Sequence, residues 1–199
     1  MLLGLRETAG LQADRHPDAG SAELVIIPDR RFDEPGFDSE AWNSGESNAA
    51  AAFRALRLRE EYEPIRAKPG DVVFVAPSGR GRLASLLRAD GLATLASESS
   101  GSILRDSRNA GIVFPWTLDE LAEKRIDFAA LIGRPERFEN LFAAVDFMVA
   151  RCEKAVIVSF DRPELKSELV ARGFRKFNFG RGSVLLRTTT KYELRKVEK

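Results

Sequence analysis

A glycine-containing turn and a later acidic residue are the parts of this sequence whose types and spacing best suit ligand chemistry. The turn Ser78-Gly79-Arg80-Gly81 follows an uninterrupted apolar run at 72–76 and precedes a helix-favouring segment. Glycine lets the backbone approach a ligand closely and adopt positive φ angles. Glu98 follows these glycines by about 20 residues, the spacing at which nucleoside-binding folds place an acid that binds ribose hydroxyls. The alternative is an ordinary tight turn with Glu98 exposed to solvent.

Alternating strands and helices must position this turn. After Gly70, short apolar runs are separated by glycine-containing turns and helix-favouring segments, which is the pattern of βαβ units with a parallel sheet. Ligands of such sheets bind beyond the carboxyl ends of the strands. The sequence therefore predicts a three-layer, Rossmann-like α/β domain, mostly parallel, with an antiparallel C-terminal hairpin. The predicted strands are 72–76, 92–96, 111–114, 128–132, 155–159, 175–179 and 183–187, and the predicted helices are 83–89, 118–124, 137–152 and 164–171.

The front of the chain follows a different pattern. Residues 1–65 are predicted to form an N-terminal appendage to a domain that spans 66–199. The apolar run 24–27 favours a short strand. The polar stretch 29–47, which contains proline and glycine, is predicted to be a long loop. Residues 48–62 are rich in alanine and favour a helix.

From the glycine turn onward, the chain resembles the class I S-adenosylmethionine-dependent methyltransferases. The segment 73–84 is similar to the first motif of that family, a strand followed by a glycine-rich turn. The segment 168–177 is similar to its last helix, Gly-Phe turn and closing strands, and the whole resemblance covers about 66–188. It implies S-adenosylmethionine as the cofactor and methyl transfer as the reaction. The resemblance implies that the turn with Ser78, Gly79 and Gly81 wraps the methionine part of the cofactor. It implies that Glu98 binds the ribose hydroxyls, and that Trp116 and Thr117 lie near the adenine.

Two positions in the first motif depart from the family pattern. Val75 stands where the family usually has an acid, and Pro77 replaces its first glycine. After the fourth strand, Ile132-Gly133-Arg134-Pro135 occupies the place of the Asp-Pro-Pro-Tyr type of motif found in amino-group methyltransferases, so the methyl acceptor is not named. These departures motivate a second hypothesis, a catalytically inactive methyltransferase-like domain that serves as a binding or structural subunit. A third hypothesis is a GNAT-type acyltransferase, which a V-shaped, splayed sheet would distinguish.

Composition excludes several other classes of protein. The chain has 199 residues with 31 Lys+Arg and 30 Asp+Glu, and 44% of its residues are hydrophobic, as in a globular domain. The single cysteine, Cys152, excludes a disulfide framework within the chain, and with the single histidine, His16, it argues against structural zinc. No apolar run approaches the roughly 18–20 residues that span a bilayer, and the N-terminus lacks the features of a secretory signal. We therefore expect a cytoplasmic protein that makes no membrane contact.

The nearly balanced charge conceals a basic C-terminal segment. Residues 151–199 contain 13 basic and 6 acidic residues, a net charge of +7. A segment of this charge suits phosphate or an acidic protein partner, so nucleic acid is a predicted partner and a predicted class of methyl acceptor. The residues expected to contact nucleic acid or another anion are Arg172, Arg175, Lys176 and Arg181. The alternative is a solvated basic surface that closes the domain.

Overall fold

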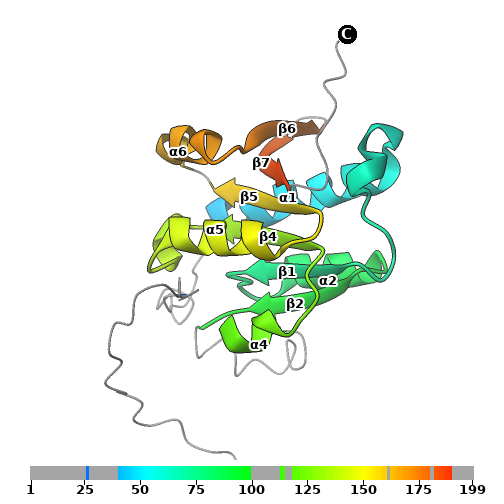
Figure 1. Ribbon diagram of the computed structural model, residues 1–199, viewed down its shortest axis with the longest axis horizontal. Coiled ribbons are helices and arrows are strands. Elements are labelled where there is room, and N and C mark those ends of the chain that lie inside the picture. The colour runs from blue at the N-terminus through cyan, green and yellow to red at the C-terminus, as the bar shows by residue number, and fades with distance from the viewer. Residues whose placement is uncertain are drawn as a thin grey trace, which may run out of the picture.

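The computed structural model describes residue 26 and residues 40–99, 113–114, 118–160, 162–179 and 182–189. They contain a seven-stranded sheet with the order β3-β2-β1-β4-β5-β7-β6 (Figure 1). Strands β1 to β5 pair in parallel, whereas β7 is antiparallel to both β5 and β6. The strand order reverses direction at β1, which makes the β1–β4 boundary the switch point where α/β sheets bind ligands. The strands are β1 (Val72–Ala76), β2 (Ala93–Ser97), β3 (Val113–Phe114), β4 (Phe128–Gly133), β5 (Ala155–Phe160), β6 (Arg175–Phe179) and β7 (Gly182–Thr188).

Helices cover both faces of the sheet. One hydrophobic cluster packs α1 and α2 against one face, and a second packs α4, α5 and α6 against the other. Strand β4 is buried at every position because its side chains face both clusters alternately. The helices are α1 (Glu40–Leu58), α2 (Arg82–Ala89), α4 (Leu118–Ala122), α5 (Leu141–Arg151) and α6 (Lys166–Ala171), with 3₁₀ turns at Glu60–Ile65, Pro135–Arg137 and Pro163–Leu165. None of the helices within the described ranges is long and apolar enough to cross a membrane.

The predicted order of strands and helices is confirmed from β1 to β7, with ends that shift by a few residues. The strand order also argues against the GNAT-type hypothesis. The order β3-β2-β1-β4-β5-β7-β6 reverses at β1, which is the order of a doubly wound sheet. Within it, β4 and β5 stay paired along their whole length, from Phe128 opposite Ala155 to Gly133 opposite Phe160.

Helix α1 overturns part of the predicted loop at 29–47, because the helix begins at Glu40. Its first turns contain glycine, serine and asparagine, which have low helix propensity, so tertiary packing decides the outcome here. Gly45 makes that packing close: a Cβ added to it would lie 3.1 Å from the Ser159 carbonyl oxygen. Farther along the helix, Phe53 is buried in the same cluster as β4 and β5. Of the predicted strand 24–27, the structure describes only Ile26, which bridges to Phe138.

A second difference concerns the helix predicted at 137–152. The structure has a 3₁₀ turn first, and α5 then begins at Leu141. The Asn140 side chain sets this start, because its oxygen accepts a hydrogen bond of 3.0 Å from the Ala143 amide.

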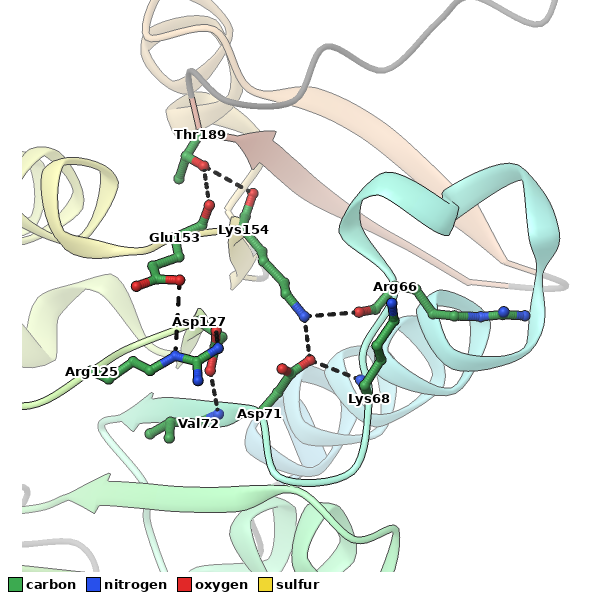
Figure 2. Close-up of polar contacts among 9 residues, drawn as sticks. All are labelled: Arg66, Lys68, Asp71, Val72, Arg125, Asp127, Glu153, Lys154 and Thr189. Carbon is green, nitrogen blue, oxygen red and sulfur yellow. Dashed lines mark hydrogen bonds and ion pairs between the residues drawn. The ribbon is translucent and has the colours of Figure 1, made fainter.

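An ionic network joins the strands at their amino-terminal edge, the edge away from the glycine turn (Figure 2). The Asp127 side chain, which is completely buried, accepts hydrogen bonds from the Val72 amide at 2.8 Å and from Arg125 at 2.6 Å. Lys154 donates to Asp71 at 2.5 Å. Since these residues lie at the starts of β1, β4 and β5, the network fixes the three central strands to one another.

We expect Asp127→Ala to lower the free energy of unfolding by about 2 kcal/mol, because it leaves the Val72 amide without its acceptor in a buried place. The matched control is Glu153→Ala, which removes an exposed carboxylate lying 3.8 Å from the same Arg125 side chain and should cost less than about 0.5 kcal/mol. Urea denaturation of both variants measures the difference. Equal losses in the two variants would contradict the structural role given to Asp127.

Cys152 offers an independent check of the core. Its side chain is buried beside α5, and this burial raises the pKa of the thiol far above its ordinary value, with a smaller contribution from nearby Asp127. We therefore expect the thiol to resist alkylation by iodoacetamide at pH 8 in the folded protein and to react readily in urea, because the thiolate is the reactive form. Mass spectrometry of the labelled protein measures this, and rapid labelling without denaturant would contradict the packing around α5.

Candidate functional site at the carboxyl edge of the sheet

The turn after β1 adopts the backbone conformation that its glycines predict. Gly79 and Gly81 have φ angles of 51° and 74°, in the left-handed region that residues with a Cβ rarely adopt. The Gly81 amide donates to the Ser78 carbonyl oxygen at 2.9 Å, and α2 begins at the next residue. The turn is therefore tight and places its backbone directly above the carboxyl end of β1.

Glu98 meets this turn. It follows β2, the parallel neighbour of β1, and its side chain is completely buried. One carboxylate oxygen accepts a hydrogen bond from the Gly79 amide at 3.0 Å, and the other accepts from the Ser99 amide at 2.8 Å. The structure thus brings together the two parts of the predicted site, and it excludes the alternative in which Glu98 is exposed to solvent.

Arg137 completes the arrangement and was not among the predicted residues. It belongs to the 3₁₀ turn after β4, is only 3% exposed, and forms an ion pair with the Glu98 carboxylate. Since β1 lies between β2 and β4, this ion pair spans the carboxyl end of β1. An arginine that follows a proline in a polar turn has the sequence signature of a surface residue, so no sequence pattern distinguishes Arg137 from an exposed arginine.

Two buried hydroxyl groups belong to the residues next to Gly79 and Glu98 in the sequence. The Ser78 and Ser99 hydroxyl oxygens are inaccessible to solvent and have no hydrogen-bond partner in the described part of the chain. Buried polar groups in proteins are normally hydrogen-bonded, so unsatisfied hydroxyls beside a carboxylate indicate a place for a polar ligand. The residues therefore fit the polar end of a nucleoside, provided that Arg137 moves away from Glu98.

The departures from the family motif are also visible in the structure. Val75 is completely buried within β1 and packs in the cluster shared with α1 and α2, so it presents no polar group to a ligand. Pro77 is buried and has no backbone N–H to donate. Predicted residues Trp116 and Thr117 lie outside the described residues.

Three of the four basic residues predicted to bind anions, Arg172, Arg175 and Lys176, lie within the described part of the chain. Arg172 is held by carboxylates, with ion pairs to Glu168 at 3.0 Å and Asp146 at 3.4 Å. Arg175 and Lys176 are exposed on opposite faces of β6, because successive side chains of a strand alternate. Arg181 lies outside the described residues. Arg175 and Lys176 therefore face opposite sides of the sheet, and anion binding by these residues stays a prediction.

Comparison with known proteins supports the fold. No profile of a protein family matches the sequence, and the search of curated proteins found no relative. Among solved structures, precorrin-6y C5,15-methyltransferase from Geobacter metallireducens GS-15 is similar with a TM-score of 0.52 and 12% identity, over 81% of this chain and 95% of that one. Magnesium protoporphyrin IX methyltransferase from Synechocystis PCC 6803, solved with bound S-adenosylmethionine, gives a TM-score of 0.50 and 14% identity, over 81% and 89% of the two chains. The chain therefore has the Rossmann-like fold of class I S-adenosylmethionine-dependent methyltransferases.

We expect strong energetic coupling between Glu98 and Arg137. The variant Arg137→Met removes the guanidinium that pairs with a buried carboxylate and should lower the free energy of unfolding by about 3–5 kcal/mol. Adding Glu98→Gln should restore part of this loss, which gives a coupling energy of about 2 kcal/mol in a double-mutant cycle. Urea denaturation of the four proteins measures the coupling.

The matched control is the ion pair between Glu136 and Arg162, which lies at the same edge with both side chains about half exposed. Its coupling energy should stay below about 1 kcal/mol because water screens exposed charges. Equal coupling in the two cycles would mean that the Glu98–Arg137 pair is not the buried interaction described above.

Proposed function

We propose that this chain binds S-adenosylmethionine at the carboxyl ends of β1 and β2 and is a methyltransferase. The single observation that carries the proposal is the contact between the Gly79 amide and the Glu98 carboxylate, 3.0 Å apart, at the switch point of a methyltransferase-like sheet. A backbone with positive φ angles and a buried acid beside it are the two elements that a nucleoside with ribose hydroxyls requires.

The cofactor would supply an electrophilic methyl group on a sulfonium. The residues of the chain would bind and orient it: the backbone at Gly79 and Gly81 permits close approach, and Glu98 accepts hydrogen bonds from the ribose hydroxyls. The buried hydroxyl of Ser78 supplies a further polar contact. Such a site accelerates methyl transfer by holding donor and acceptor in line and by excluding water.

Arg137 sets a condition on this proposal. Its guanidinium already occupies the Glu98 carboxylate, so ribose hydroxyls and the guanidinium compete for the same oxygen atoms. Binding therefore requires Arg137 to leave Glu98, and the affinity for the cofactor is reduced by the free energy of that opening.

The same ion pair favours a second candidate function. In a methyltransferase-like subunit that has lost catalysis, Arg137 would fill the place of the cofactor permanently and stabilise the edge of the sheet. The apolar Val75 and the proline at position 77, in place of the usual acid and glycine, agree with this reading. Such a domain would transfer no methyl group and would need no methyl acceptor. It would serve as a binding or structural subunit.

Calorimetry with S-adenosylhomocysteine tests both candidates. If Arg137 competes with the ribose, Arg137→Gln should bind S-adenosylhomocysteine about tenfold more tightly than the unmodified protein, since one charge-assisted hydrogen bond no longer has to be broken. The control Arg88→Gln removes an exposed arginine from the last turn of α2, at the end of that helix away from the glycine turn, and should leave the affinity unchanged.

The outcome distinguishes a cofactor site that Arg137 blocks from a domain that no longer binds the cofactor. Binding that tightens in Arg137→Gln supports the methyltransferase proposal. An absence of heat at millimolar S-adenosylhomocysteine in both the unmodified protein and Arg137→Gln would reject it and leave the non-catalytic subunit as the function.

A further inference from the structure

The sheet opens at its carboxyl edge between β5 and β7. The antiparallel pairing of these strands runs from Ala155 opposite Thr188 to Val158 opposite Leu185 and ends there. Beyond that point β5 and β7 are no longer paired with each other. Ser159 of β5 stays paired with β4, and Ser183 of β7 stays paired with β6. The carboxyl end of β5 and the amino end of β7 therefore separate, which leaves a gap between the two strands.

A cleft of ≈ 340 Å³ lies at this separation, within the usual size range of pockets for small organic molecules. Helix α1 borders it through Gly45 and Asn48, α6 borders it through Lys166 and Leu169, and the 3₁₀ turn before α6 borders it through Leu165. The close approach of Gly45 to the Ser159 carbonyl fixes α1 against the end of β5. The cleft is therefore formed by packed secondary structure on both faces of the sheet.

The lining of the cleft combines an apolar interior with positive charge. Val158, Phe160 and Leu185 contribute apolar surface from the strands. Three described lining residues are cationic, namely Arg162, Lys166 and Lys176, and none of the described lining residues carries a carboxylate.

The three cations differ in what neutralises them. Arg162 pairs with Glu136 and Glu164 just outside the cleft. Lys166 and Lys176 form no ion pair within the described part of the chain, and they reach the cleft from α6 and β6 respectively. Two uncompensated lysines beside an apolar wall attract an anionic group and leave room for an apolar body.

We propose that this cleft binds a small organic anion, with its phosphate or carboxylate group at Lys166 and Lys176 and its apolar body against Val158, Phe160 and Leu169. The site is distinct from the one at Gly79 and Glu98, because neither of those residues lines the cleft. It lies at the same edge, however, two strands from β1, which corresponds to about 10 Å. We assign this cleft to the methyl acceptor, an assignment that rests on the proposed function. The acceptor is then a small anionic molecule.

Titration of the ¹⁵N-labelled protein with phenyl phosphate tests the cleft in the absence of any cofactor. Phenyl phosphate should shift the amide signals of Ser183, Val184 and Lys166, and inorganic phosphate and phenol should each bind at least several-fold more weakly. In the double variant Lys166→Gln/Lys176→Gln, the affinity should fall by about tenfold or more, because each lysine supplies a charge-assisted hydrogen bond. Both lysines are exposed, so the substitutions should leave the fold intact.

Arg88→Gln is the matched control, since it removes an exposed cation from α2, and it should bind phenyl phosphate like the unmodified protein. A lack of shifts at the cleft amides, or an equal loss of affinity in Arg88→Gln, would overturn the proposal. Inorganic phosphate binding as tightly as phenyl phosphate would overturn the role of the apolar wall.

A binding experiment with an oligonucleotide distinguishes a small-molecule cleft from a surface that binds nucleic acid. If a single-stranded oligonucleotide binds and loses affinity equally in Arg175→Gln and Lys176→Gln, then both faces of β6 contact phosphate and the cleft proposal is wrong. If phenyl phosphate binds in the cleft but S-adenosylhomocysteine fails to bind even to Arg137→Gln, the anion site stands and only its assignment to a methyl acceptor is overturned.

Discussion

The buried ion pair between Glu98 and Arg137 is the interaction on which the carboxyl edge of this sheet depends. A carboxylate that is completely buried requires compensation, and here it comes from one guanidinium and two backbone amides. The pair joins the residue after β2 to the turn after β4 and so closes the end of β1 between them. Because the Glu98 carboxylate also accepts a hydrogen bond from the Gly79 amide, one buried group links the glycine turn to the 3₁₀ turn that holds Arg137.

The two edges of the sheet use charge for different purposes. At the amino-terminal edge, Asp71, Asp127 and Lys154 bond to neighbouring backbone atoms and to charged side chains within the network (Figure 2). At the carboxyl edge, unsatisfied hydroxyls at Ser78 and Ser99 remain near a charge pair. This asymmetry agrees with the general rule that α/β sheets bind ligands at the carboxyl ends of their strands.

The sequence predicts those features of the fold that depend on the pattern of neighbouring residues. Continuous apolar runs such as 72–76 and 128–132 identify strands, and the spacing from Gly79 to Glu98 predicts that both belong to one site. The hydrogen bond between them is known only from the structure. Pairing over long distances leaves no such pattern: Arg137 meets Glu98 across 39 residues, and the separation of β5 from β7 depends on where a ladder ends. The start of α1 is hidden for a related reason, since Gly45 favours a loop locally and is held in a helix by contact with β4 and β5.

One short turn connects the proposed nucleoside site with the cleft proposed to bind an anion. In the turn Pro135–Arg137, Glu136 pairs with Arg162 at the mouth of the cleft, and the next residue, Arg137, pairs with Glu98. Adjacent residues of a 3₁₀ turn project in different directions, so the turn can contribute one charge to each site without strain. The turn follows β4, which is the strand between β1 and β5. The two sites therefore share a single structural support, placed where a methyl donor above β1 and an acceptor beside β5 would have to meet.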